Sequence, residues 1–422
     1  MKILNSQSLT LLLFIIPLSF ILGIAVTEFF VFFCTILFLI INKDKSLFFD
    51  KKIIFLFLFS AYIFTNAYFK ISDNLKLGSI FYFRYVLFSL AIFYFCKLFE
   101  NSKNKKYFFL LISFLLILII DSFIQFFYGF NTLGFKITGD RVSSFFNDEL
   151  ILGSFLVRLM PIILWFIFFL KIDLKKNIIP IIAFFSLYFI TIYLSGGRTS
   201  FFLSVVIILG LFIIIKDLRR ILSYSIIIMI FFIFITSYFK IGKANTFNRI
   251  FVKTYNQITK VEINTNKSDT KIKKELKTFN IYSEDHEGHI LLALNLFEKN
   301  KIFGIGPKGF KHYCRKVNYT PKIGICSTHP HNILIQIVLE LGLIGLAFYI
   351  IAAIFVLFNF FKSIVRQKFN YDYLAFYSIT LGLIINLFPL IPGGNFFNNW
   401  ISIILYYNIG LYLYSYKKCI LK

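Results

Sequence analysis

The sequence predicts an all-α protein that crosses a membrane many times and carries one large loop on the outer side. Of its 422 residues, 58% are hydrophobic and only 15% are charged, and the mean hydropathy is +0.79. A soluble globular domain carries about 25% charged residues. The apolar residues form long runs, and one extended polar segment, 240–331, interrupts them. These observations place the chain in a lipid bilayer.

Apolar runs long enough to cross about 30 Å of hydrocarbon, at about 1.5 Å per helical residue, predict twelve transmembrane helices. They are expected at 8–26, 27–42, 53–69, 79–98, 107–127, 150–170, 178–194, 200–215, 221–239, 332–361, 374–392 and 400–416. The first run is interpreted as a helix and not as a signal peptide, because no small-residue cleavage site follows it. The chain then divides into N-terminal helices, helices joined by arginine-bearing outer turns, the polar loop, and C-terminal helices. These four parts are 1–120, 121–239, 240–331 and 332–422.

The basic residues are distributed as membrane topology requires. Lys and Arg number 45 against 20 Asp and Glu, which gives a net charge of +25. They cluster in alternate short connections, such as 43–52, 97–106 and 171–176. Such clusters stay in the cytoplasm, so both termini are expected there and the segment 240–331 on the outer side. Clusters placed between apolar runs argue against nucleic-acid binding.

All five histidines lie in the outer loop or at its junction with the following span. They are His286, His289, His312, His329 and His331. Polar residues gather in any large polar segment, so a purely solvent-exposed role is the simple alternative. That alternative is weaker for the junction pair, His329 and His331, because the membrane boundary is where a lipid-linked group and a soluble group meet.

Six of the nine arginines map to the outer side, whereas the cytoplasmic side relies mainly on lysine. The six are Arg84, Arg141, Arg158, Arg198, Arg249 and Arg315. A guanidinium binds phosphate oxygens through two parallel N–H donors, which an ammonium cannot do. The pattern therefore predicts an anionic ligand at the outer face. Arg158 is expected about 12 Å below the outer boundary, where it faces a cavity or, alternatively, pairs with Asp121, Asp148 or Glu149.

Cys314 and Cys326 are the two of five cysteines that fall in the outer loop. Two cysteines in an oxidising compartment predict a disulfide. A zinc site that uses His312, His329 and His331 is the alternative, but the spacings match no standard zinc pattern.

A glycine-rich stretch of the loop, residues 304–309, matches the pattern GxGxxG. We do not interpret it as a dinucleotide site, because no strand-turn-helix context surrounds it and Pro307 disrupts a helix start there. It is expected to be a turn after the short amphipathic stretch 284–299.

Several motifs resemble the O-antigen ligase and O-antigen polymerase family of membrane glycosyltransferases. His331-Asn332, followed after nine residues by Gly342-Leu343-Ile344-Gly345, resembles the histidine motif at the start of the family's post-loop helix. The turn Ser195-Gly196-Gly197-Arg198-Thr199-Ser200 resembles the family's arginine-bearing turn. Because the histidine motif reads His329-Pro330-His331, a register shifted by two residues also fits. Further similar stretches, found between about 121 and 405, are 121–129, 141–153, 304–306 and 388–400.

The resemblance implies a glycosyltransferase of the bacterial inner membrane with a periplasmic active site. The implied donor is a glycan on undecaprenyl pyrophosphate, the implied acceptor is lipid A-core or a growing glycan, and no metal or other cofactor is implied. Attack of an acceptor hydroxyl on an anomeric carbon releases a pyrophosphate, so such a site needs cations for the leaving group and a base for the hydroxyl. His331 and Arg198 are then the expected catalytic residues. Pyrophosphate binding is expected from Arg141, Arg249, Arg315 and Arg158.

The motifs leave ligase, polymerase and protein glycosylation open, because all three share them. A secondary transporter for an anionic or lipid-linked substrate is the alternative from another class, suggested by Arg84 and Arg158 inside predicted spans. Two related halves, which many transporters show, are not visible in this sequence.

Overall fold

The computed structural model describes residues 6–70, 79, 81–259, 284–316, 327–366 and 370–420. Within these residues the protein is helical and has no β-strand, only two isolated bridges in the segment 130–141. The predicted all-α architecture is confirmed for this part of the chain.

Every predicted span overlaps a helix. The helices before the polar segment are α1 (Ser6–Ser19), α2 (Ile24–Ile41), α3 (Lys51–Lys70), α5 (Phe83–Ser102), α6 (Lys105–Tyr128), α7 (Leu152–Phe169), α8 (Ile178–Leu194), α9 (Arg198–Ile214) and α10 (Arg219–Tyr238). The later ones are α11 (Lys253–Thr259), α12 (Glu284–Glu298), α13 (Gly309–Lys316), α14 (Ile333–Val365), α15 (Tyr371–Asn386) and α16 (Asn399–Cys419).

Six helices of the described chain are long and apolar enough to cross a membrane. They are α2, α3, α6, α7, α10 with the turn before it, and α14. The number of twelve spans and the single large outer loop stay predictions.

α7 forms the centre of the bundle. Within the protein 94% of α7 is buried, compared with 17% to 39% for the other five long apolar helices. A helix that is apolar all round belongs in such a core, and α7 packs against α8, α9 and α15. The peripheral helices instead expose large apolar side chains, such as Phe231 on α10 and Ile354 on α14. A continuous apolar surface of this kind needs lipid to cover it.

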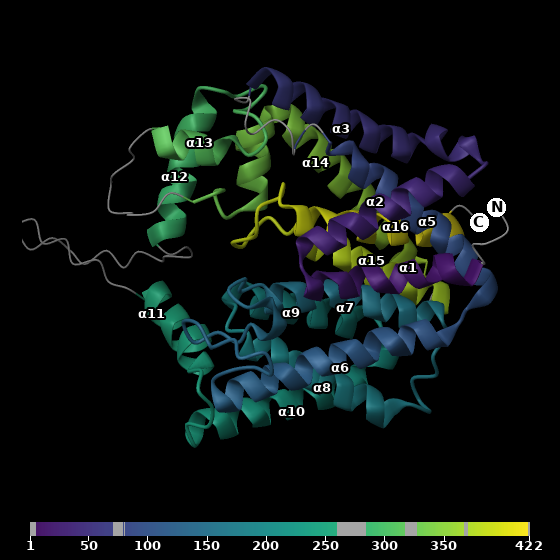
Figure 1. Ribbon diagram of the computed structural model, residues 1–422. Coiled ribbons are helices and arrows are strands. Elements are labelled where there is room, and N and C mark those ends of the chain that lie inside the picture. The colour runs from purple at the N-terminus through teal and green to yellow at the C-terminus, as the bar shows by residue number, and fades with distance from the viewer. Residues whose placement is uncertain are drawn as a thin grey trace, which may run out of the picture.

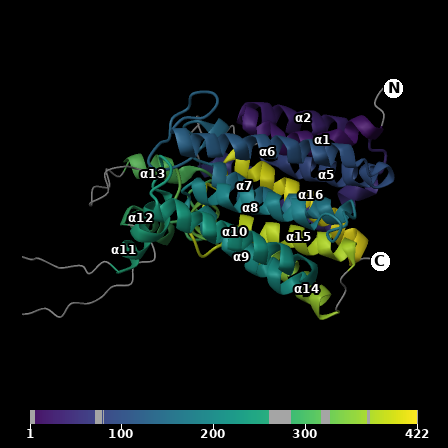
Figure 2. The ribbon, with the colours of Figure 1, turned by 90° about the horizontal axis from the view of Figure 1, so that it is seen from below.

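The polar elements gather at one end of the bundle. Figures 1 and 2 show the long helices running side by side, with α11, α12 and α13 together at one end. α1 begins and α16 ends at the opposite end, beside the marked chain ends. The polar elements therefore lie at the end remote from the start of α1 and the end of α16.

α14 is broken at Gly342, although the sequence predicted one continuous span at 332–361. Gly342 has φ 67° and ψ −164°, which is not helical. A helix of 33 residues is about 50 Å long, more than the roughly 30 Å of a bilayer core. The break divides it into an outer piece, 333–341, and an inner piece, 343–365.

The segment 301–306 fills the break and satisfies the backbone groups that it frees. The N–H of Leu343 donates to Lys301 O (2.9 Å), and the N–H groups of Ile305 and Gly306 donate to Leu339 O (3.0 Å) and Glu340 O (2.9 Å). A Cβ at position 342 would overlap the carbonyl of Ile302, so the docked chain requires glycine there. The first residues of the expected glycine turn, 304–306, thus belong to the segment that fills the helix break.

Candidate active site

Three of the predicted arginines surround one turn, Ser195-Gly196-Gly197, between α8 and α9. Gly196 has φ 63°, and a Cβ there would lie 2.8 Å from Asp140 O and 3.1 Å from Arg249 Cδ. Only glycine fits a position that is both left-handed and this crowded. Arg198 follows as the first residue of α9, exposed, with Nη1 donating to Gln257 Oε1 (2.7 Å).

Arg141 and Arg249 reach the same turn from two other loops. Arg141 donates to Ser195 O (3.3 Å) and Leu150 O (2.5 Å). Arg249 donates to Gly196 O (3.0 Å) and to Gly139 O (2.9 Å). Each guanidinium carries five N–H donors, so both keep donors beyond those that hold the turn.

The electrostatics of the arginine cluster, Arg141, Arg198 and Arg249, favour an anion. Burial, and then the charge of Arg249, lower the pKa of Arg141 to about 10. Burial, and then Arg198, lower the pKa of Arg249, and Asp140 opposes this shift. The lowered pKa values of Arg141 and Arg249 reflect, after burial, repulsion between the positive charges of the cluster, and a bound anion relieves that repulsion.

A buried polar scaffold holds the loop that carries Arg141. The carboxylate of Asp121 accepts hydrogen bonds from Asn131 (3.1 Å), Thr132 (2.9 and 2.5 Å) and Ser144 (2.5 Å). Gln125 Oε1 accepts from the N–H of Ser144 (2.7 Å). The motif at 121–129 thus has a structural explanation, which is to anchor both ends of the Arg141 loop to α6.

The other two predicted arginines lie elsewhere. Arg158 is buried on α7, where it donates to Ser154 and lies over the ring of Trp400 at 5.5 Å. Within the described residues no carboxylate pairs with it, so the alternative of an ion pair with Asp121, Asp148 or Glu149 is wrong. Arg315 is exposed on α13, which packs against α12 and α14 and not against the arginine cluster.

Arg84 has a structural partner. Its Nη2 lies 3.0 Å from Glu28 Oε1, and Tyr85 donates to the same carboxylate (2.8 Å). The contact weakens the argument for an anion carrier that Arg84 and Arg158 suggested.

Four imidazoles come together before α14. The ring of His331 lies 4.2 Å from that of His329, 4.7 Å from His286 and 5.5 Å from His289, measured between centroids. His286 and His289 are one turn apart on α12, and α12 packs on the outer piece of α14. His312 lies apart from this histidine cluster, beside Tyr313 on α13. Within the described residues no group of His, Cys, Asp or Glu is arranged to hold a metal ion.

The two junction histidines differ in their hydrogen bonds. His329 is only 7% exposed, and both its ring nitrogens are engaged, Nδ1 with Thr328 Oγ1 (3.0 Å) and Nε2 with Gly393 O (3.1 Å). His331 is half-buried, and its Nε2 bonds Ser327 Oγ (2.8 Å). Its Nδ1 has no hydrogen bond to any described residue.

The backbone holds His331 just outside the helix. Asn332 is the N-cap of α14 and accepts from Ile335 N (3.0 Å), while its Nδ2 donates to Pro389 O (2.8 Å). His331 itself has φ 57°, a left-handed conformation that is uncommon for a side-chain-bearing residue. Strain of this kind concentrates at functional sites.

Both junction histidines are neutral at physiological pH. Burial, which outweighs the opposing bond to Gly393 O, lowers the pKa of His329 to about 4. Burial, followed by the neighbouring His329, His286 and His289, lowers the pKa of His331 to about 3. A neutral imidazole is able to accept a proton.

Cys314 is disulfide-bonded. The predicted partner, Cys326, lies outside the described residues, so the pairing stays a prediction.

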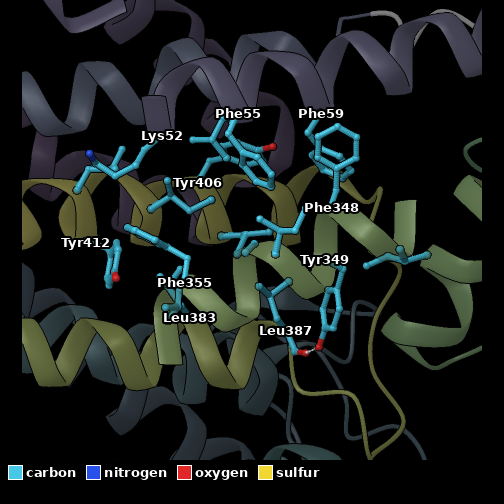
Figure 3. A pocket seen from close by; sticks show the side chains of 18 of the residues that line it. Lys52, Phe55, Phe59, Phe348, Tyr349, Phe355, Leu383, Leu387, Tyr406 and Tyr412 are labelled. Atoms are coloured by element: carbon cyan, nitrogen blue, oxygen red, sulfur yellow. Dashed lines mark hydrogen bonds between the residues drawn. The ribbon is translucent and has the colours of Figure 1, made fainter. Parts of the chain in front are cut away.

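An apolar cavity of about 360 Å³ lies inside the membrane part, between α3, α14, α15 and α16 (Figure 3). Phe55 and Phe348 are among its aromatic lining residues, and Lys52 lies at one side. On the other side Tyr349 donates to Leu387 O (2.8 Å). None of the predicted site residues is in its described lining, and the apolar walls suit a lipid chain and not a reacting group.

Sequence reasoning missed two parts of this arrangement. It did not join His286 and His289 to the junction pair, although their spacing of three residues in an amphipathic stretch places both on one helix face. It also overlooked Gln336 and Glu340, polar residues four apart inside an apolar run. Both spacings are visible in the sequence, but the position of α12 beside His331 is not.

Residues 181–350 match the family model described as O-antigen ligase. The match includes the turn with Arg198, Arg249, and all five histidines. It confirms the predicted resemblance to the O-antigen ligase and polymerase family. No curated protein sequence matches the chain.

Proposed function

Since residues 181–350 of this chain match the family model described as O-antigen ligase, we propose that the protein transfers a lipid-pyrophosphate-linked glycan to an acceptor hydroxyl. The observation that carries the proposal is the arginine cluster around 195–197, together with a neutral imidazole, His331, at the same end of the bundle, whose Nδ1 has no hydrogen bond to a described residue. The cations match the leaving group, and the imidazole matches the nucleophile.

In this reaction the acceptor oxygen attacks the anomeric carbon of the donor sugar. A new C–O bond forms as the bond from that carbon to the pyrophosphate oxygen breaks, and the leaving group takes the electron pair. The hydroxyl proton passes to Nδ1 of His331. Positive charge near the leaving oxygen stabilises the transition state, because negative charge develops there.

The arginines divide the work. Arg198 is exposed and is assigned to contact the pyrophosphate directly. Arg141 and Arg249 each donate one hydrogen bond to the turn and one to another backbone carbonyl, and they direct their remaining donors and charge to the same anion. Arg158, buried beneath the site, and Arg315, on α13, are assigned weaker roles in binding.

With a pKa of about 3, His331 is a weak base when no anion lies beside it. A base works best when its pKa is near the operating pH, and about 3 is well below that. A nearby anion stabilises the imidazolium and raises the pKa. Binding of the pyrophosphate donor therefore makes His331 a stronger base only when substrate is present.

We assign the protein to a bacterial inner membrane, with cytoplasmic termini and a periplasmic site. The donor is a glycan on undecaprenyl pyrophosphate, and the acceptor is lipid A-core or a growing glycan on its carrier. Deletion of the gene followed by gel analysis of lipopolysaccharide separates the two. Free core with accumulated lipid-linked polymer indicates a ligase, core bearing one repeat indicates a polymerase, and an unchanged pattern contradicts both.

A further inference from the structure

The outer piece of α14 carries two buried polar side chains that the proposed reaction does not use. Gln336 and Glu340 are both 0% exposed and lie one turn apart among apolar neighbours. Burying an amide and a carboxyl group is costly unless both are hydrogen-bonded. Their bonds reach the two segments that hold the histidine cluster.

Gln336 holds the segment beneath the junction histidines. Its Nε2 donates to Asn395 Oδ1 (2.8 Å), and its Oε1 accepts from Phe396 N (2.9 Å). Two residues earlier in that segment, Gly393 N donates to His331 O (2.7 Å), and Gly393 O accepts from His329. A shift of this segment therefore moves both histidines.

Glu340 holds the segment on which α12 rests. Its Oε1 accepts from Phe310 N (3.2 Å), and its backbone oxygen accepts from Gly306 N (2.9 Å). The ring of Phe310 lies edge-on to His289, 6.2 Å between centroids, and packs in a small core with Leu292 of α12. Through Phe310, Glu340 thus fixes the position of α12, and of the two histidines on it, relative to α14.

One hydrogen bond, from Gln336 Nε2 to Glu340 Oε2 (3.0 Å), links the contacts of Gln336 with those of Glu340. We propose that Gln336 and Glu340 are positioning residues, which bring the α12 histidines and the junction histidines into one cluster and so aim the free nitrogen of His331. This assignment rests on the proposed function, and neither residue touches the reacting atoms.

The test compares Gln336→Leu and Glu340→Gln with a matched control. Asn359→Leu removes another buried amide of α14, whose Nδ2 donates only to its own helix at Phe355 O (2.7 Å). Transfer is measured with purified protein in lipid nanodiscs, using a polyprenyl-pyrophosphate-linked oligosaccharide. Gln336→Leu and Glu340→Gln should each lower kcat by about ten- to hundred-fold, because small misplacements of a catalytic group have effects of that order. KM for the donor should change little, and the control should match wild type.

A swapped variant, Gln336→Glu with Glu340→Gln, guards against simple misfolding. It keeps an acceptor for Phe310 N, an acceptor for Phe396 N and the bond between the two side chains, and should recover part of the lost kcat. A kcat of the swapped variant above that of both single variants is the result expected if Gln336 and Glu340 are positioning residues. Equal loss in the swap and in both single variants, at wild-type protein levels, would overturn it.

A second measurement does not depend on activity. Diethyl pyrocarbonate modifies accessible neutral imidazoles, and mass spectrometry locates the products at His329 and His331. Both should react several-fold faster in Gln336→Leu and Glu340→Gln than in wild type or Asn359→Leu. Unchanged reactivity overturns the positioning assignment even where transfer is lost. Faster reactivity in a protein whose wild type transfers no glycan supports the positioning and overturns the proposed function.

Discussion

Arg198 differs from the other two arginines of its cluster in how its guanidinium is used. Arg141 and Arg249 each donate to two backbone carbonyls, whereas Arg198 donates to the side chain of Gln257 and is exposed. A substitution at position 198 therefore tests ligand binding with the least disturbance of the turn.

We expect Arg198→Lys to lose nearly as much activity as Arg198→Ala, on the order of a hundred-fold in kcat. A point charge cannot replace a two-pronged contact to the diphosphate. Steady-state transfer by the purified variants measures this. Arg220→Lys is the control, because Arg220 is exposed at the other end of the bundle. Full activity of Arg198→Lys would show that charge alone suffices.

The hydrogen bonds of the junction histidines also favour His331 as the acting residue. His331→Ala should reduce transfer by about a hundred-fold or more while membrane levels stay normal. His329→Gln should retain measurable transfer, because its role is to hold Gly393 and Thr328. A reconstituted transfer assay decides the register, and the opposite ranking would identify His329 as the base.

Acid should loosen the histidine cluster. An unfolded imidazole has a pKa of about 6.5, whereas burial holds His329 near 4 and His331 near 3. Below about pH 6.5 the imidazoles bind protons when the cluster is unfolded but not when it is folded. The stability of the cluster is therefore fully present above about pH 6.5 and falls as the pH falls below that value. At pH 5.5, one unit below the unfolded pKa, the loss is on the order of 1 kcal/mol per histidine, because one pKa unit corresponds to about 1.4 kcal/mol.

Hydrogen exchange measures this loosening. Amides in 327–341, corrected for intrinsic rates, should exchange faster at pH 5.5 than at pH 7.5, while those in α15 should not. The double variant His329→Gln with His331→Asn should lose the difference. A pH-independent rate in the wild type would contradict the burial of neutral imidazoles.

At the scale of single helices, the apolar runs predicted where the helices lie in the chain but not where a helix is broken. The runs located the start of α14 to within one residue, with 332 predicted and Ile333 observed, because an apolar stretch is a local property. The break at Gly342 depends on the segment 301–306 docking from more than thirty residues away, which no local pattern reveals. The same limit explains why α12 was not placed beside His331, whereas the glycine-arginine turn at 195–198 was found from its own residues.

Gly342→Ala should destabilise the protein by more than about 2 kcal/mol, because a methyl group would add a backbone clash to the left-handed strain. Gly134→Ala separates these effects, since Gly134 has φ 86° with nothing within 4 Å of a Cβ. It should cost only about 1 kcal/mol. Thermal unfolding in detergent compares the two variants. Equal decreases in unfolding temperature would show that the segment 301–306 moves to make room for the methyl group at position 342.

At the scale of the whole molecule, the gathering of α11, α12 and α13 at the end opposite the termini agrees with the charge-based topology (Figure 1). Lys175, in the connection between α7 and α8, is exposed and is expected on the cytoplasmic side, whereas Glu298 is exposed on α12 and is expected outside.

A membrane-impermeant maleimide should label Glu298→Cys in intact spheroplasts and Lys175→Cys only after permeabilisation. The native Cys34, Cys96 and Cys419 are buried and give little background. Labelling of both variants in intact spheroplasts, or the reverse order, would contradict the topology.

The break at Gly342 also bears on the order in which the chain is assembled during synthesis. The inner piece, 343–365, is about 35 Å long and able to span by itself, whereas the outer piece, 333–341, is about 14 Å long and is not. Insertion is therefore directed by the inner piece. The segment 301–306 is made before α14, whereas the partners of Gln336 in 393–396 are made after it. Because 393–396 follows α14 and α15 in the chain, the segment that supports the junction histidines is available only after both of these helices have been synthesised.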